Sequence, residues 1–190
     1  MKQLFRIHNP VILVVMFLTC YNNVQIIGQN KPENNCWQLE PGQNGFIQLV
    51  NNNEAGESLI IYGKIIDHKT KLPVNGAALF LYQTDSTGIY NSTGPDEQAR
   101  IRGTVNTDAN GCFKIRTILP GDYPGRKNSR HLHYVINAKG FKEKKSILFF
   151  KGFTTENITD QGPLIVLDIK KDKTGTWIGS TDLSIESSGK

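Results

Sequence analysis

Residues 59–67 read LIIYGKIID, a run of apolar and largely β-branched side chains that indicates a β-strand. After the polar turn that begins at Lys69, further short apolar segments lie at 77–82, 103–105, 112–116, 131–138, 146–150, 164–169 and 176–178. Gly, Pro, Asn and Asp separate these segments, and no ten-residue stretch among them has the apolar period of a helix. We therefore expect an all-β fold, an antiparallel β-sandwich of about eight strands with long loops. The segment DANG at 108–111 predicts a tight hairpin turn, because Asn-Gly favours a positive φ.

The 190 residues suffice for one domain plus a terminal appendage. We expect a signal peptide at 1–28, a loosely structured lead-in rich in Asn and Gly at 29–58, the sandwich at 59–185 and a flexible tail at 186–190. Within the lead-in, only residues 46–50 have strand character. No apolar run reaches the ~18–20 residues of a membrane-spanning helix, so no membrane span is expected.

The first 28 residues have the pattern of a secretory signal peptide. Lys2 and Arg6 precede the apolar run VILVVMFL at 11–18, polar residues follow, and cleavage is expected near Gly28. An uncleaved anchor is the alternative, although the apolar run is short for one. Lipid attachment at Cys20 is a further alternative, but Phe17 and Thr19 do not fit its usual pattern. We therefore expect a secreted or periplasmic protein.

The net charge bears on the class of partner, and the cysteine content bears on disulfide bonding. The formal net charge is +5, and two of those charges belong to the expected signal peptide. The remaining basic residues are scattered, which argues against a nucleic-acid partner. The expected mature chain keeps Cys36 and Cys112, which either form a disulfide or remain two thiols.

Two histidines and two tyrosines are the candidate chemical residues. Residues two apart on a strand point the same way, so His131 and His133 can direct both imidazoles at one point. Two exposed histidines on a sheet face are the simpler alternative. Tyr123 lies in the sequence GDYPG at 121–125, and Tyr90 follows a glycine-containing turn. Each tyrosine alone is most often a core or rim aromatic.

These four residues belong to a series of short motifs that occur in a fixed order along the chain. The motifs are Gly63-x-Ile65-x-Asp67, Pro73-Val74-x-Gly76-Ala77, Tyr82-Gln83-x-Asp85-x-x-Gly88-x-Tyr90, Arg102-Gly103, Thr107-Asp108-x-x-Gly111, Thr117-Ile118-x-Pro120-Gly121-x-Tyr123-Pro124 and His131-x-His133. In this order they resemble the catalytic domain of intradiol ring-cleavage dioxygenases, of the protocatechuate 3,4-dioxygenase and catechol 1,2-dioxygenase type. The resemblance covers residues 59–150 and, more loosely, the strands that follow.

The resemblance implies a non-haem Fe(III) ion held by Tyr90, Tyr123, His131 and His133. Two phenolates suit a hard ferric ion, whose field would ionise them, and two imidazoles complete the set. A site with two histidines and one carboxylate is the competitor, with Asp122 as the nearest acid. No organic cofactor is implied.

The resemblance also implies the reaction. A catechol-type substrate and O2 would give a muconate-type dicarboxylate that contains both oxygen atoms. The residue matching Tyr123 would leave the metal and accept a catechol proton, while the residue matching Tyr90 would stay bound. His131 would lie opposite Tyr123, and His133 would be an equatorial ligand.

Two supporting residues of the family are displaced or absent here. The usual arginine lies three residues before the first histidine, at the position of Asn128, whereas this chain has Arg126 and Arg130. We take Arg130 as the candidate catalytic arginine, which requires that its loop bend toward the site. The usual glutamine falls on Ile147. Because losing one charge-stabilising donor commonly costs ~10²–10³ in rate, weak or lost activity is an expected alternative.

The alternatives to a dioxygenase are a non-catalytic β-sandwich binding module and a ferric-binding pseudoenzyme. We expect no helical dimerisation domain in residues 1–58, and the sequence predicts no oligomeric state. A secreted single domain would suit an extracellular catechol derived from lignin or other polyphenols.

Overall fold

The structure is a computed structural model, and it describes residues 35–154 and 165–189. The predicted signal peptide, Cys20 and residues 29–34 of the predicted lead-in lie outside the described residues. Within the described ranges, no helix is long and apolar enough to cross a membrane.

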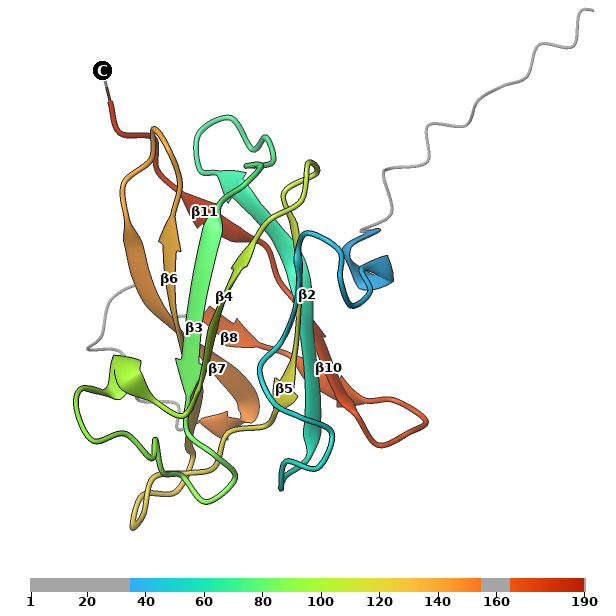
Figure 1. Cartoon of the computed structure of the whole chain (residues 1–190), viewed down its shortest axis with the longest axis vertical. Helices are drawn as coiled ribbons and strands as arrows, with labels where there is room; N and C mark the ends of the chain where they lie inside the picture. Colours follow the sequence, from blue (N-terminus) through green and yellow to red (C-terminus); the bar gives the residue numbers. More distant parts are fainter. Residues whose placement is uncertain (1–34, 155–164, 190) are drawn as a thin grey trace, which may run out of the picture. The chain divides into compact units, whose positions relative to one another are not determined.

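The chain forms two β-sheets that face each other (Figure 1). One sheet has the order β1-β5-β2-β10-β9, and β11 also pairs with β2. Its strands are β1 (Phe46–Gln48), β2 (Ser58–Asp67), β5 (Cys112–Ile118), β9 (Ile169–Lys171), β10 (Trp177–Ser180) and β11 (Leu183–Ile185). The other sheet has the order β4-β3-β6-β7-β8. Its strands are β3 (Ala78–Gln83), β4 (Ile101–Asn106), β6 (Ser129–Asn137), β7 (Lys144–Thr154) and β8 (Ile165–Leu167). Two short 3-10 helices, η1 (Asn35–Gln38) and η2 (Asp96–Gln98), complete the described elements.

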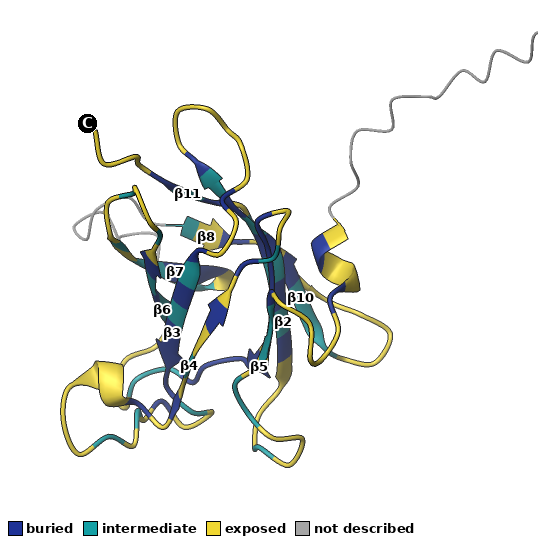
Figure 2. Ribbon diagram, turned by 45° about the horizontal axis from the view of Figure 1, so that its top comes forward, coloured by how far each residue is buried: buried dark blue, intermediate teal, exposed yellow. Residues whose placement is uncertain are grey.

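The all-β sandwich predicted from the sequence is confirmed. In β2, the strand predicted first, buried and half-buried residues alternate, so one face packs into the core. The core lies between the sheets and includes the fully buried side chains of Leu59, Ile61, Phe113, Tyr134 and Phe150. Figure 2 shows this burial along the central strands, while η2 and its loop are exposed.

The strand pairing is richer than the sequence indicates. The described residues form more strands than the eight expected, because the segment expected at 164–169 divides into β8 and β9 in different sheets, and short strands form at 46–48 and 183–185. Four of the pairings are parallel: β1 with β5, β10 with β2, β11 with β2, and β7 with β8. The turn at 108–111 has the predicted positive φ at Gly111, but it is no hairpin, since β4 and β5 belong to different sheets.

The expectation of a loose lead-in needs correction for residues 35–58. Cys36 and Cys112 form a disulfide, and β1 pairs with β5 in the core sheet. The buried Lys114 ammonium donates hydrogen bonds to the carbonyl oxygens of Trp37 (2.7 Å) and Leu39 (2.8 Å). This segment is therefore an integral part of the sandwich.

The expected flexible tail is also partly ordered. The Lys142 N–H donates to the Glu186 carbonyl (2.8 Å), and Ser188 N–H donates to the Gly140 carbonyl (2.9 Å). The Ser187 hydroxyl donates to Asp67 Oδ2 (2.6 Å). Residues 186–188 thus continue the fold rather than extend freely from it.

Candidate metal centre

The two candidate histidines lie on β6 and point the same way, as their spacing predicts. Their Nε2 atoms are 2.9 Å apart, and both side chains are half-buried. The Nδ1 atom of His131 lies 2.5 Å from the carbonyl oxygen of Ser129. A carbonyl oxygen only accepts hydrogen bonds, so Nδ1 carries the proton and the Nε2 lone pair of His131 is free to bind a metal.

The two candidate tyrosines reach the histidines from two loops, one within the histidine-bearing sheet and one that crosses to it from the other sheet. Tyr90 lies between β3 and β4, and Tyr123 lies between β5 and β6, at one end of the sandwich (bottom of Figure 1). The two hydroxyl oxygens are 2.7 Å apart. The Tyr123 hydroxyl is 3.1 Å and the Tyr90 hydroxyl 3.5 Å from His131 Nε2. The structure therefore brings all four candidate ligands together.

Buried polar contacts hold the two tyrosine loops against each other. The Gln83 side chain, fully buried, donates to the Ile118 carbonyl (2.9 Å) and accepts from the Thr117 hydroxyl (2.9 Å). One residue on, the Thr84 hydroxyl donates to the Gly121 carbonyl (3.2 Å). Gly121 N–H in turn donates to the Asp85 carbonyl (2.8 Å). The ends of β3 and β5 are thus joined just before each loop presents its tyrosine.

Asp85 shapes the loop that carries Tyr90. Its Oδ1 atom accepts hydrogen bonds from the Thr87 N–H (2.8 Å) and the Thr87 hydroxyl (2.6 Å). Its Oδ2 atom accepts from the Asn91 side-chain amide (2.5 Å). On the other loop, Asp122 Oδ1 accepts from Ser129 N–H (2.7 Å), which closes the segment around Tyr123. Each ligand loop is therefore organised by its own aspartate.

The site favours uncharged side chains when no cation is bound. Burial raises the pKa of the Tyr90 hydroxyl far above its usual range, and the hydrogen bond with Tyr123 adds to this. Burial also raises the pKa of Tyr123, although its bond with Tyr90 and the charge of Arg126 oppose the rise. Burial lowers the pKa of His131. Burial also lowers the pKa of His133, to about 4, and the charge of the neighbouring His131 adds to this effect. Two phenols and two neutral imidazoles result at neutral pH, and a cation would provide the charge needed to ionise the phenols.

The donor atoms fit a single metal ion. Nitrogen and oxygen ligands bind at ~2.0–2.1 Å, so two of them at ~90–110° lie ~2.9–3.4 Å apart. The separations observed between the four donors, 2.7, 2.9, 3.1 and 3.5 Å, bracket that range. Two phenols and two imidazoles form a donor set suited to a hard trivalent ion.

The carboxylate alternative receives no support. The described part of the chain contains no group of three or more His, Cys, Asp or Glu placed to hold a metal. Asp122, the nearest acid in the sequence, accepts from Ser129 and lies 3.5 Å from Arg130 Nε.

The side chain of Arg130, the candidate catalytic arginine, contacts two residues beside the site. Its guanidinium lies 4.9 Å from the centre of the Phe153 ring, in addition to its contact with Asp122. Asn128, at the position of the usual arginine, has a left-handed backbone with φ of 56°. Arg126 is the arginine whose charge lowers the pKa of Tyr123. Ile147 lies directly across from His133 on β7, where the resemblance places a glutamine.

Sequence reasoning missed two neighbours of the ligands. Tyr82 stacks on His133 with ring centres 4.6 Å apart and an angle of 2° between the planes. Burial raises the pKa of Tyr82 to about 12, helped by the negative charges of Glu97 and Asp96. Asp96 also raises the pKa of Tyr90 and Tyr123. Tyr82 is the first residue of the motif that ends at Tyr90, but the motif predicted no role for it, and nothing in the sequence distinguishes Asp96.

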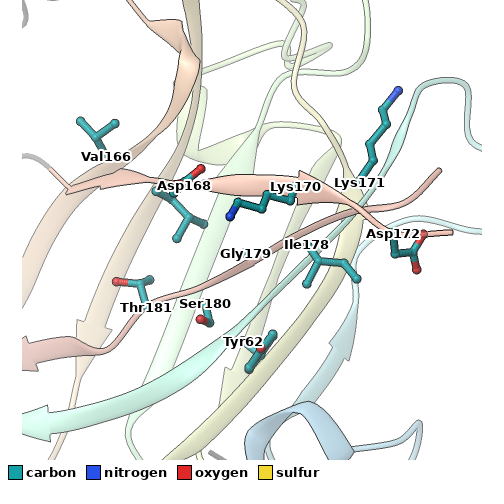
Figure 3. Close-up of a pocket in the computed structure, with 11 residues that line it drawn as sticks. Tyr62, Val166, Asp168, Lys170, Lys171, Asp172, Ile178, Gly179, Ser180 and Thr181 are labelled. Carbon is teal, nitrogen blue, oxygen red and sulfur yellow. The ribbon is translucent and has the colours of Figure 1, made fainter. Parts of the chain in front are cut away.

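The positions of the cavities are a second criterion for locating the functional site. A cavity of about 270 Å³ adjoins the candidate ligands and is lined by Tyr82, Glu97, His133, Lys145 and Ile147, among others. A more open one of about 570 Å³ lies on the other sheet, over Tyr62, Ile178 and Ser180 (Figure 3). None of the four candidate ligands lines that open cavity. Two of the charged residues on its wall form ion pairs, Asp168 with Lys151 (3.7 Å) and Lys171 with Glu57 (2.6 Å).

Comparison with known proteins shows the family of the chain. The profile of a protein family described as "Dioxygenase" matches residues 35–161. The dioxygenase domain of a dioxygenase and carbohydrate-binding protein fusion from Streptomyces sp. SirexAA-E is 30% identical, with a TM-score of 0.63. That match covers 79% of this chain and 93% of the domain. The fold is also that of 3-chlorocatechol 1,2-dioxygenase from Rhodococcus opacus, with 24% identity, a TM-score of 0.62 and coverage of 78% and 69%.

Two curated relatives extend the comparison. Catechol 1,2-dioxygenase of Acinetobacter baylyi is 28% identical over 54% of this chain and 39% of its own length. The 6-chlorohydroxyquinol 1,2-dioxygenase of Cupriavidus pinatubonensis is 28% identical over 70% of this chain and 52% of its own length. The matches thus span about half of these relatives or less. With the family profile covering well over half of this chain, the chain belongs to the intradiol dioxygenase family.

Proposed function

We propose that this protein is a non-haem Fe(III)-dependent dioxygenase that cleaves a catechol-type ring with O2 to a muconate-type dicarboxylate. The observation that supports it most is the convergence of four donor atoms from Tyr90, Tyr123, His131 and His133. Relatives named for catechol and hydroxyquinol substrates support the substrate class. Overall, one ring carbon–carbon bond breaks and both atoms of O2 enter the product, so no external reductant is needed.

The proposed roles follow from the placement of the side chains. When bound, a ferric ion would act as a Lewis acid that withdraws electron density from the catechol ring and so opens it to O2. Tyr123 would accept the proton of an incoming catechol hydroxyl on its phenolate oxygen, the role that the family pattern gives to this position. Tyr90 would remain a ligand. His131 is held by the Ser129 carbonyl with its Nε2 lone pair directed at the site.

The catalytic role of Arg130 stays a prediction. To reach a substrate, Arg130 would have to leave Asp122 and Phe153. The Arg126 N–H donates to the Tyr123 carbonyl (2.9 Å), so this arginine lies in the same turn as the candidate ligand. We therefore extend the catalytic prediction to Arg126, and variants of both residues discriminate between them.

Oxygen consumption tests the proposal. The ferric-loaded protein is offered catechol, hydroxyquinol and larger catechol derivatives in an oxygen electrode, and products are identified by ultraviolet spectra and mass. The expected result is uptake of one O2 per substrate and a dicarboxylate that gains two oxygen atoms. Iron binding without oxygen uptake on any substrate would support the ferric-binding pseudoenzyme, and the absence of iron binding would support the binding module.

We also propose that residues 1–28 direct secretion or export to a periplasm. The disulfide between Cys36 and Cys112 supports this, because disulfides persist mainly in oxidising compartments. Mass spectrometry of the protein recovered from the medium or the periplasm should find an N-terminus near residue 29. A full-length chain in the cytoplasm would contradict the proposal, and a lipid on Cys20 would favour the lipoprotein alternative.

A further inference from the structure

The two candidate histidine ligands are held in different ways. His131 donates from Nδ1 to the Ser129 carbonyl. Among the described residues, the hydrogen-bond contact of the His133 ring is the one between its Nε2 and His131, which leaves Nδ1 without a protein partner. Histidines that bind metals almost always donate their second N–H to a carboxylate, carbonyl or water, which fixes the ring orientation. The orientation of His133 therefore needs another source.

The ring of Tyr82 covers one face of His133. Tyr82 and His133 are directly paired residues of β3 and β6, and Tyr82 is only 8% exposed. Their rings are nearly parallel, with an interplanar angle of 2° and ring centres 4.6 Å apart. Such an offset stack is a favourable arrangement for two aromatic rings and leaves little freedom to tilt.

Ile147 occupies the position across from His133 on the next strand. It is paired with His133 in the β6–β7 register, so Tyr82, His133 and Ile147 form one row across three strands. Residues in such a row have side chains on the same face of the sheet. The imidazole thus lies between an aromatic ring and an aliphatic side chain instead of beside a hydrogen-bonding amide.

We propose that Tyr82 is a positioning residue that fixes the orientation of the His133 ring by stacking, as the Ser129 carbonyl does for His131 by hydrogen bonding. The inference rests on the proposed function, in which His133 binds the metal. It predicts that the aromatic face of Tyr82 matters and that its hydroxyl does not.

Three variants separate the effects of the Tyr82 ring, of its hydroxyl and of side-chain bulk on this strand. Tyr82→Phe keeps the ring, and Tyr82→Leu removes it. Phe80→Leu is the matched control, because Phe80 lies two residues earlier on the same face of β3 and pairs with Val135, and its ring contacts Tyr82 (centres 5.8 Å apart) instead of a candidate ligand. Thermal unfolding of each variant shows that the chain still folds.

The first measurement uses the metal-free protein. The ring protons of His133, assigned by NMR, should be shifted upfield by the ring current of Tyr82 in the wild type, Tyr82→Phe and Phe80→Leu, and not in Tyr82→Leu. A wild-type shift equal to that of Tyr82→Leu would overturn the inference. This measurement does not depend on whether the protein binds iron or cleaves catechol.

The second measurement is ferric affinity by competition with a chelator. Loss of an outer partner of a metal-bound histidine typically costs 10–100-fold in affinity, so Tyr82→Leu should bind ferric iron about 10–100-fold more weakly. Tyr82→Phe and Phe80→Leu should match the wild type. Equal affinities for Tyr82→Leu and wild type would contradict the positioning role. A wild type that takes up no iron would contradict the proposed function, and the NMR shift would then decide the stacking alone.

Discussion

Gly88 and Asp122 meet backbone to backbone: a Cβ atom added to Gly88 would overlap the carbonyl oxygen of Asp122. Gly88 also has a φ of +85°, in the left-handed region. On the opposite loop, a Cβ on Gly121 would lie 2.5 Å from Gly88 N. The loops carrying Tyr90 and Tyr123 therefore approach as closely as their backbones allow, and this contact sets the spacing between the two phenols.

Gly88→Ala is predicted to separate the tyrosine loops. Because the added methyl group meets fixed backbone rather than a flexible side chain, the loops must move apart, and ferric binding with its visible charge-transfer band should be lost or strongly weakened. Gly76→Ala is the control, since Gly76 also has a positive φ of +68° but nothing within 4 Å of an added Cβ. That control should lose only about 1 kcal/mol of stability and keep the band. An unchanged band in Gly88→Ala would contradict the account.

The disulfide is predicted to stabilise the fold without contributing to the site. Cys36 and Cys112 are separated by 76 positions, so losing the bridge should reduce the unfolding free energy by about 4 kcal/mol in the chain-entropy description. Denaturant unfolding of the Cys36→Ala/Cys112→Ala double variant gives the value. Wild type treated with reductant should shift in the same direction. If the double variant unfolds at the wild-type denaturant concentration, the stabilising role is excluded.

Asp67 is predicted to give an acid-sensitive contribution to stability. Its carboxylate accepts from Ser187 (2.6 Å) and from the N–H groups of Thr70 and Lys69 (both 2.7 Å), and these bonds lower its pKa from 3.8 to about 2. A carboxyl whose pKa is lower in the folded state stabilises it fully above the unfolded value. The contribution falls as pH decreases below about 4 and is gone below about 2.

Asp67→Asn tests this pH dependence. The melting temperature of the variant should be clearly below that of wild type at pH 7, and the difference should shrink as the pH falls toward 2. A difference that stays constant from pH 7 to pH 2 would show that the charge of Asp67 contributes nothing.

Arg130 and Arg126 are predicted to act differently. Arg130→Gln should release the Asp122 contact and lower iron content and thermal stability. Arg126 has no contact with Asp122 like that of Arg130, so if Arg126 stabilises transition-state charge, Arg126→Gln should lower kcat by about 10²–10³ with iron content close to that of wild type. A large loss of kcat in Arg130→Gln at full iron content would restore the original catalytic assignment to Arg130.

The sequence was sufficient to predict the fold class and the grouping of the four candidate ligands. The β-branched run at 59–67 and the two-residue spacing of His131 and His133 are local signals, and the structure bears out both the strand and the shared direction. The order of motifs placed Tyr90 and Tyr123 beside them. These predictions needed only strand periodicity and a family pattern.

Contacts between distant segments were beyond the reach of local patterns. Tyr82 reads as an ordinary strand aromatic until β3 is paired with β6 in the observed register. Cys36 lies in a stretch of Asn, Gly and Gln without periodicity, so the sequence left open whether it pairs with Cys112, and the structure shows the bond. The parallel edge pairings depend in the same way on long-range register, which composition does not encode.

Titration of the metal-free protein with ferric iron, followed by visible absorption, tests most directly whether the two phenols and two imidazoles share one ion. The expected result is saturation at one iron per chain with a tyrosinate-to-iron band, a displaced and weaker band in Tyr123→Phe, and loss of tight binding in the His131→Ala variant. A wild-type protein that stays colourless at saturating ferric iron, or a band that Tyr123→Phe leaves unchanged, would contradict the central claim.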